Sequence, residues 1–202
     1  MRLEVPPLPY PVDALEPHVS ARTVSVHYEE HHKGYLHKLR DQLERAPEPN
    51  GNNTLEHLVL QPARATYNNA AQVWNHNFYW RSLRPPHPDG EPHGRLRELV
   101  EKSFGSVRML RRQLGEAAND HFASGWAWLV ENAEGRLAVM STPDAENPLI
   151  HGQRPLLAID VWEHAYYLDH HAERSHHVRV VVDHLMNWDF VVENLNSRDF
   201  AV

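Results

Sequence analysis

The sequence predicts an α+β fold, in which an N-terminal helical hairpin domain precedes a C-terminal α/β domain with a small three-stranded antiparallel sheet. Three observations support this prediction. Helical patterns fill residues 20–83, strand-like runs begin near residue 125, and helical patterns return after residue 164. An order of helices, strands and helices is typical of α+β proteins.

The N-terminal half is predicted to contain two long helices. The first pattern runs from Ser20 to about Arg45, and the second runs from Arg64 to Leu83. The loop 46–53, rich in proline, glycine and asparagine, separates them, and a short helix is expected to begin at Thr54. In both long helices the distinctive residues recur four positions apart, which places them on one helix face.

The proline- and glycine-rich run 84–94 is the best candidate for a domain boundary. We place the boundary after residue 86, which gives domains 1–86 and 87–202. Beyond it, two helices are expected at 95–102 and 106–118, three strands at 125–131, 136–142 and 155–160, and two helices at 164–171 and 178–196. The turn 132–135 is expected to join the first two strands as a β-hairpin.

Composition excludes several classes of protein. The formal charge is −7, and the 20 Lys and Arg residues are scattered, so no basic face for nucleic acid is expected. No apolar run reaches the length needed to span a membrane, and the start of the chain lacks a secretory pattern, so a cytoplasmic location is expected. The chain has no cysteine, which excludes thiolate metal sites and disulfides, whereas its 17 histidines are an unusual number.

Four residues could meet at one metal ion. His27 and His76 lie on the two long helices, Asp160 ends an apolar strand, and His164 follows it. Three imidazoles and one carboxylate suit iron, manganese or zinc. Each residue alone has a simpler interpretation, because a histidine on a helix face is more often a hydrogen-bonded core residue and an aspartate at a strand end is more often a helix cap.

The flanking residues favour the metal hypothesis. Segments of the chain resemble, in order, the conserved segments of iron/manganese superoxide dismutases: Leu8–Tyr10, His27–Tyr35, Asn68–Trp80, Ser124–Leu129 and Asp160–Tyr167. The matches cover nearly the whole chain, and several long matches in order are far more specific than a single motif.

The resemblance implies that His27, His76, Asp160 and His164 bind one metal ion together with a solvent molecule. It implies a superoxide dismutase, which converts superoxide to dioxygen and hydrogen peroxide in two half-reactions. Its substrate would be superoxide, and neither nucleic acid nor a membrane is an expected partner.

The resemblance also implies roles for three residues near the ligands. Gln72 would donate a hydrogen bond to the metal-bound solvent and lower the reduction potential. Tyr35 would gate the entrance and relay protons, and His31 would be the entrance histidine.

Five further residues are assigned to the wall of the site and to a subunit interface. Trp126, Trp128 and Trp162 would form an apolar wall around the ligands, although plain core packing explains tryptophans equally well. Glu163 would accept a hydrogen bond from His164 of a second subunit, and Tyr167 would contact that subunit's His31. A homodimer is therefore expected, alone or paired into a tetramer.

The metal is expected to be iron, with manganese as the alternative. In iron-type members the glutamine comes from the second long helix, as Gln72 does here. Manganese-type members usually supply it from a loop before a proline, where this chain has Ala145. Both metals share the same ligands, so the ligands themselves do not decide between them.

The chain departs from the family pattern in three places. Glu30 stands where a basic or neutral residue is common, and Lys33 is expected to offset it. Ala123 replaces a usual glycine. In residues 169–177 only Arg174 survives clearly, and His177 replaces a tyrosine; we expect the histidines of this segment, from His170 to His177, to form a solvated surface rather than a second metal site.

Two other functions remain open. A related fold could bind a metal without turning over, and only an assay of superoxide consumption separates that possibility. A mononuclear iron oxygenase or a zinc hydrolase could use similar ligands, but these enzymes need a cleft for an organic substrate, which a wall of tryptophans leaves little room for.

Overall fold

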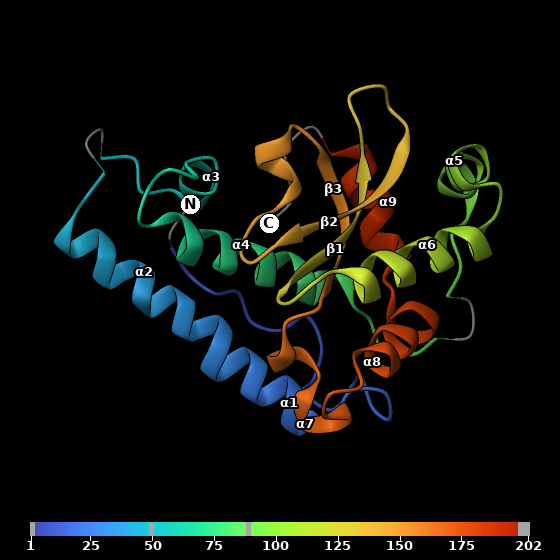
Figure 1. Ribbon diagram of the computed structural model, residues 1–202, viewed down its shortest axis with the longest axis horizontal. Helices are drawn as coiled ribbons and strands as arrows, with labels where there is room; N and C mark the ends of the chain where they lie inside the picture. Colours follow the sequence, from blue (N-terminus) through green and yellow to red (C-terminus); the bar gives the residue numbers. More distant parts are fainter. Residues whose placement is uncertain (1–2, 49–50, 88–89, 198–202) are drawn as a thin grey trace.

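Two long helical segments form the N-terminal half of the computed structural model, which describes residues 3–48, 51–87 and 90–197 (Figure 1). The first segment is continuous and comprises α1 (Ala21–Val26), a π-helical turn (His27–His32) and α2 (Lys33–Arg45). It begins where the sequence predicted, because the Ser20 side chain accepts a hydrogen bond of 3.1 Å from the Thr23 amide. The π-helical turn was not predicted.

The second segment consists of the short α3 (Leu55–Leu58) and the long α4 (Tyr67–Ser82). The predicted helix at 64–83 is thus confirmed except for its first turn. Almost every residue of α4 is buried, because α2 packs on one side of it while β3 and α9 pack against it from the C-terminal half. A helix buried all round carries apolar residues on every face, which explains the weak periodicity of its sequence.

The sheet contains β1 (Gly125–Glu131), β2 (Leu137–Pro143) and β3 (Arg154–Asp160) in the order β2-β1-β3, with both pairs antiparallel. This confirms the predicted hairpin and the predicted three-stranded sheet. In the central strand, Trp126 lies opposite Asp160 of β3. The strands approach so closely at Gly125 that a Cβ atom there would clash with the Thr142 carbonyl oxygen, so the position requires glycine.

Helices surround the sheet (Figure 1). The C-terminal half contains, besides the strands, α5 (Gly94–Phe104), α6 (Val107–Asp120), α7 (Tyr167–His170), α8 (Arg174–Val180), a π-helical turn (Val181–Leu185), α9 (Trp188–Asn196) and 3₁₀ turns at Pro148–His151 and Glu163–Ala165. The fold class is therefore α+β, as predicted. Helix α6 packs on β1 and β2.

The predicted helix at 178–196 was wrong as a single element. The chain is extended at Met186, which pairs with Leu83 just beyond α4. The Arg84 amide donates to the Leu185 carbonyl at 2.8 Å, and the Asn187 amide donates to Ser82 at 2.9 Å. These long-range hydrogen bonds replace those that a continuous helix would make.

The predicted helix at 164–171 was also wrong in part, because it is divided into a 3₁₀ turn and α7 at Tyr166. Residues 49–50 and 88–89 of the two predicted loops lie outside the described residues, and the domain boundary after residue 86 stays a prediction.

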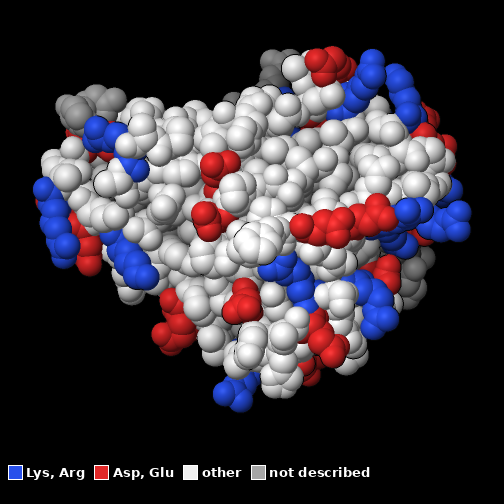
Figure 2. All heavy atoms as spheres, viewed as in Figure 1, with Lys and Arg blue, Asp and Glu red and all other residues white. Residues whose placement is uncertain are grey.

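The surface carries charges of both signs. On the face viewed in Figure 2, basic and acidic side chains are interspersed and no patch of one sign covers it. No described helix combines the length and the hydropathy that crossing a membrane would need.

Ala123 lies in the left-handed region, with a φ of 61°. In this conformation a residue with a Cβ atom is strained by about 1–2 kcal/mol relative to glycine. Glycine in turn lowers the free energy of unfolding by about 0.4–1 kcal/mol, because it gives the unfolded chain more conformational entropy. We therefore expect Ala123→Gly to raise the free energy of unfolding by about 0.5–1 kcal/mol. Urea unfolding of the metal-free protein measures this change. Ala133→Gly, at an exposed turn position without a positive φ, is the control; an equal gain there would contradict the explanation.

Candidate metal centre

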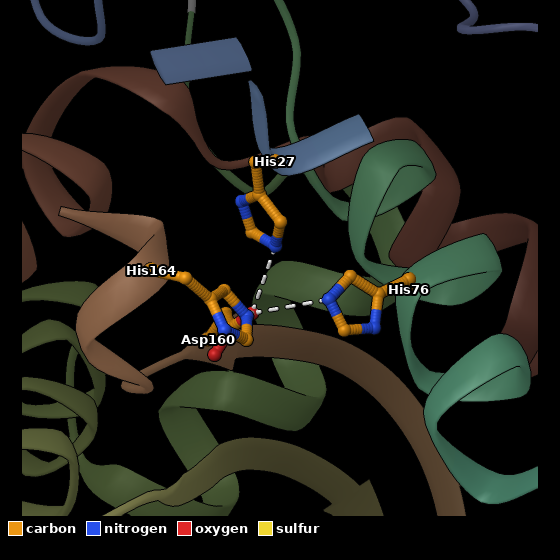
Figure 3. A group of neighbouring side chains, drawn as sticks. All are labelled: His27, His76, Asp160 and His164. Atoms are coloured by element: carbon orange, nitrogen blue, oxygen red, sulfur yellow. Dashed lines mark hydrogen bonds and ion pairs between the residues drawn. The ribbon is translucent and has the colours of Figure 1, made fainter. Parts of the chain in front are cut away.

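The four predicted ligands come together from four separate elements. His27 begins the π-helical turn of the first long helix, His76 lies in the middle of α4, Asp160 ends β3, and His164 lies in the 3₁₀ turn that follows. Figure 3 shows their side chains pointing toward one another. One ligand atom from each lies within 4.8 Å of those from the other three. Both halves of the chain therefore contribute to one centre.

The Asp160 carboxylate is the centre of the group. Its Oδ2 atom lies 3.2 Å from His27 Nε2, 3.6 Å from His76 Nε2 and 3.2 Å from His164 Nε2. Its Oδ1 atom accepts a hydrogen bond of 2.9 Å from the Trp162 amide. The side chains of Asp160 and His76 are fully buried, and that of His164 is 9% exposed.

The donor set fits a borderline metal ion. His76 Nδ1 donates to the Gln72 carbonyl at 2.8 Å, so the Nε2 atom that faces the centre carries a lone pair. His27 Nε2 and His76 Nε2 are both buried without a hydrogen-bond partner among the described residues. Buried polar atoms are rarely left unpaired. A backbone carbonyl on the far ring nitrogen is also the usual arrangement of a metal-binding histidine.

The charges of the centre favour a cation. Burial raises the pKa of Asp160, but the neighbouring His164 and His27 outweigh this effect and hold the pKa well below its usual range. Burial lowers the pKa of His27 to about 4, against the opposing effect of Asp160. Burial and the neighbouring His27 lower the pKa of His76 as well. At neutral pH the centre therefore presents the neutral imidazoles of His27 and His76 beside one negative carboxylate.

Gln72, Tyr35 and His31 all lie beside this group. The Gln72 amide donates to the Tyr35 hydroxyl at 3.5 Å, and the Tyr35 ring centroid is 5.4 Å from that of His76. Burial and the charge of Asp160 raise the pKa of Tyr35 to about 12. The His31 ring stacks on His164, with centroids 4.3 Å apart.

Two of the three predicted tryptophans contact ligand rings. Trp126 meets His76 edge to face at 5.1 Å, and Trp162 stacks on His164 at 5.5 Å. Trp128 packs behind Trp126 at 5.9 Å and donates to Thr142. The simpler interpretation, core packing, thus describes Trp128 well.

Four aromatic residues that the sequence did not place at the centre also lie around the ligands. Trp80 and Tyr79 both contact the His27 ring, at 4.8 and 5.6 Å. His32 stacks behind His76 at 5.2 Å and accepts a hydrogen bond from Trp80. Trp80 and His32 lie in the matched segments, but only their packing reveals these contacts. The fourth residue, His177, is fully buried and contacts the Asp160 backbone.

The departures from the family pattern have structural consequences. The expectation that Lys33 offsets Glu30 is wrong, because Lys33 Nζ lies 2.6 Å from Glu29 Oε2 and pairs with that carboxylate instead. The expectation of a solvated histidine surface holds for His171, which is exposed, but is wrong for the buried His177. Among the described residues, the only group that could hold a metal ion is the one around Asp160.

Arg174, Glu163 and Tyr167 lie toward the surface. Arg174 donates to the carbonyl oxygens of His121 and Ala123. Glu163 is exposed, and Tyr167 is 48% exposed. Within one chain they complete no part of the centre.

Comparisons with known proteins agree with this geometry. Residues 2–84 match the family described as iron/manganese superoxide dismutases, alpha-hairpin domain, and residues 92–194 match iron/manganese superoxide dismutases, C-terminal domain. The chain is 42% identical to a superoxide dismutase [Fe] of Coxiella burnetii, over 98% of this chain and 100% of the relative. It is 44% identical to one of Leptolyngbya boryana and 43% identical to one of Escherichia coli K12, in both cases over 96% of this chain and 99% of the relative.

The buried histidines make the stability of the metal-free protein depend on pH. Because the folded pKa of His27 is about 4, and the unfolded value is about 6.5, the unfolded chain binds more protons between these values. The contribution of His27 to the free energy of unfolding should therefore be fully present above pH about 6.5. It should decrease as the pH is lowered toward 4. The pKa of Asp160 is lowered in the folded chain, so its contribution to the free energy of unfolding decreases only below pH about 4.

Urea unfolding of the metal-free protein at a series of pH values measures this dependence. His76→Phe should make it shallower, whereas His37→Phe, which changes an exposed histidine of α2, should leave it unchanged. A free energy of unfolding that stays constant from pH 6.5 to pH 4 would contradict the assignment of neutral buried imidazoles.

Proposed function

This chain belongs to the iron/manganese superoxide dismutase family, and from that premise we propose which of its residues carry out the dismutation of superoxide. The reaction converts two superoxide ions and two protons into dioxygen and hydrogen peroxide. The observation that carries the proposal is the convergence of three buried imidazoles on the buried Asp160 carboxylate.

His27, His76, Asp160 and His164 hold one iron ion per subunit, with manganese as the alternative metal. When bound, the ion supplies the one-electron exchange that oxidises one superoxide and reduces the next. The residues hold the donor atoms ready: the Gln72 carbonyl fixes the tautomer of His76, and the Trp162 amide holds Asp160 Oδ1. Iron agrees with the relatives named superoxide dismutase [Fe] and with the position of Gln72 on α4.

Tyr35 and Gln72 hold a proton beside the metal. Because the pKa of Tyr35 is raised to about 12, its hydroxyl stays protonated at neutral pH. The Gln72 amide donates to the Tyr35 oxygen, which leaves the hydroxyl proton free to be donated toward the reduced substrate. His31, half buried and stacked on His164, lies where it can pass protons from solvent.

The aromatic wall excludes water from the ligands. Trp126, Trp162 and Trp80 each pack against a ligand ring. In such an environment the charge of Asp160 acts on the bound ion with little screening. A pure metal-binding protein would not need Tyr35 and Gln72 at these positions, and an assay of superoxide consumption per bound iron separates the two functions.

A homodimer completes the proposal. Glu163 would accept a hydrogen bond from His164 of the other subunit, and Tyr167 would contact its His31. The exposed side chains of this region support an interface, since Phe122 is 93% exposed, Tyr167 48% and Leu168 44%. Large exposed apolar side chains commonly mark protein interfaces. A tetramer and the cytoplasmic location stay predictions.

Replacing His76 tests the ligand set. We expect His76→Ala to lose its iron during dialysis against a chelator, because a site with one ligand missing is incomplete. Elemental analysis should find close to one iron per chain in the wild type and almost none in the variant. His37→Ala is the matched control on an exposed helix position. Full iron retention by His76→Ala would contradict the assignment.

Replacing Gln72 tests its influence on the potential. A hydrogen bond to a charged group contributes about 1.5–3 kcal/mol, and about 1.4 kcal/mol corresponds to 59 mV for one electron. Since the amide favours the oxidised centre, Gln72→Gly should raise the reduction potential by roughly 60–130 mV. Gln72→Glu keeps the side-chain volume and should also shift the potential. Potentiometric titration of iron-loaded variants measures this; an unchanged potential in both removes Gln72 from its role.

Sedimentation velocity tests the dimer. The wild type should sediment at about twice the mass of the 23.4 kDa chain. Phe122→Asp should shift the population toward monomers, because it places a charge among the exposed apolar side chains. Leu60→Asp, at a position that is 51% exposed elsewhere on the chain, should leave the mass unchanged. A monomeric wild type would refute the interface.

A further inference from the structure

His177 is a fully buried histidine next to the metal centre, and the proposed function gives it no role. It lies on α8 with an exposed fraction of 0%. Its Nε2 atom is 3.2 Å from the backbone carbonyl oxygen of Asp160. A buried imidazole therefore contacts the backbone of the residue around which the centre is built.

The contact fixes the proton of the His177 ring. A carbonyl oxygen only accepts, so Nε2 carries the hydrogen and Nδ1 carries a lone pair. Tyr166 stacks on the ring at 5.4 Å, and Arg174 in turn donates to the Tyr166 hydroxyl. The ring is thus held on its face as well as at its edge.

We propose that His177 is a positioning residue for Asp160, an inference that rests on the proposed role of Asp160 as a metal ligand. Asp160 is the last residue of β3, where the ladder with β1 ends. The Trp162 amide donates to its Oδ1 atom at 2.9 Å, and His177 Nε2 donates to its backbone carbonyl oxygen at 3.2 Å. Backbone and side chain are both restrained, so Oδ2 is kept at its distance from the three imidazoles.

His170 gives this restraint a second anchor. His170 Nε2 and His177 Nδ1 are both buried and have no hydrogen-bond partner within the described part of the chain, and the two ring centroids are 6.2 Å apart. The three ligand imidazoles lie closer together, with centroids 4.7–5.5 Å apart. The wider spacing suits hydrogen bonds of about 2.8 Å to one shared water rather than metal–nitrogen bonds of about 2.0–2.1 Å. One shared water could hydrogen-bond to both nitrogen atoms, and it would link His177 to α7.

The experiment compares iron-loaded, full-length variants. His177→Phe keeps an aromatic ring on Tyr166 but removes the donor, whereas His177→Gln keeps an N–H at a similar reach. His170→Phe removes only the second anchor. His184→Phe, at an exposed histidine in the π-helical turn after α8, is the control. The readouts are the rate of iron loss to a chelator, the electron paramagnetic resonance spectrum of the ferric centre, and the melting temperature of the metal-free protein.

We expect His177→Phe to lose iron about 10–100-fold faster and to change the ferric spectrum, since partners that orient ligands have effects of this size. His177→Gln should restore both properties, and His170→Phe should shift them in the same direction by less. If His177→Phe does not fold, the iron-loss rate and ferric spectrum of His170→Phe, compared with those of His184→Phe, still test the inference. A crystal structure of the wild type should contain a water between His170 and His177.

Three results would overturn the inference: a ferric spectrum and iron-loss rate unchanged in both His177→Phe and His170→Phe, a His177→Gln variant as impaired as His177→Phe, or melting temperatures that fall without any spectral change. Each of these leaves the proposed function intact. A wild type that binds no iron would instead refute the ligand set itself, so the two failures are distinguishable.

Discussion

A carboxylate buried among three imidazoles is the interaction on which the rest of this structure depends. Asp160 is fully buried, and its Oδ2 atom lies within 3.6 Å of all three ring nitrogens. An isolated buried charge is strongly unfavourable unless it is paired or bound to a metal. The imidazoles reduce this cost only in part, because burial keeps His27 and His76 neutral. The folded chain therefore holds at its centre a negative carboxylate that His27 and His76 do not neutralise, and binding a cation stabilises it.

This requirement explains why the two halves of the chain meet where they do. The helices of the first half supply His27 and His76, and the end of β3 supplies Asp160. The halves are tied together close to these residues, since Ser82 at the end of α4 accepts a hydrogen bond from the Ala158 amide, two residues before Asp160. Rigid elements on both sides of the centre keep ligands from distant segments at a constant separation.

The sequence could predict what depends on local pattern. The long helices, the hairpin and the four ligands all carry signals within short segments, and the flanking residues of each ligand made its identification specific. It could not predict the break at Met186, which exists because Leu83, far away in the sequence, pairs with it. The same limit applies to Trp80 and His32, whose contacts with the ligands appear only when α4 packs on the first helix. A pattern along one segment contains no information about the neighbour that satisfies its backbone or covers its side chain.

His177 shows the same limit, because here the sequence indicated an exposed residue and the structure has a buried one. In sequence it belongs to a run of polar residues that replaces a family element, and such a run indicates a solvated surface. In the structure it is buried, and its ring reaches from α8 to the Asp160 carbonyl oxygen at the end of β3. The hydrogen bond from Nε2 to this carbonyl oxygen satisfies the donor of the buried ring. The departure from the family pattern thus changes the residue that contacts Asp160 at the end of β3 but leaves the four ligands unchanged. Differences between this enzyme and its relatives should therefore arise in metal retention and reduction potential before they arise in the chemistry of the reaction.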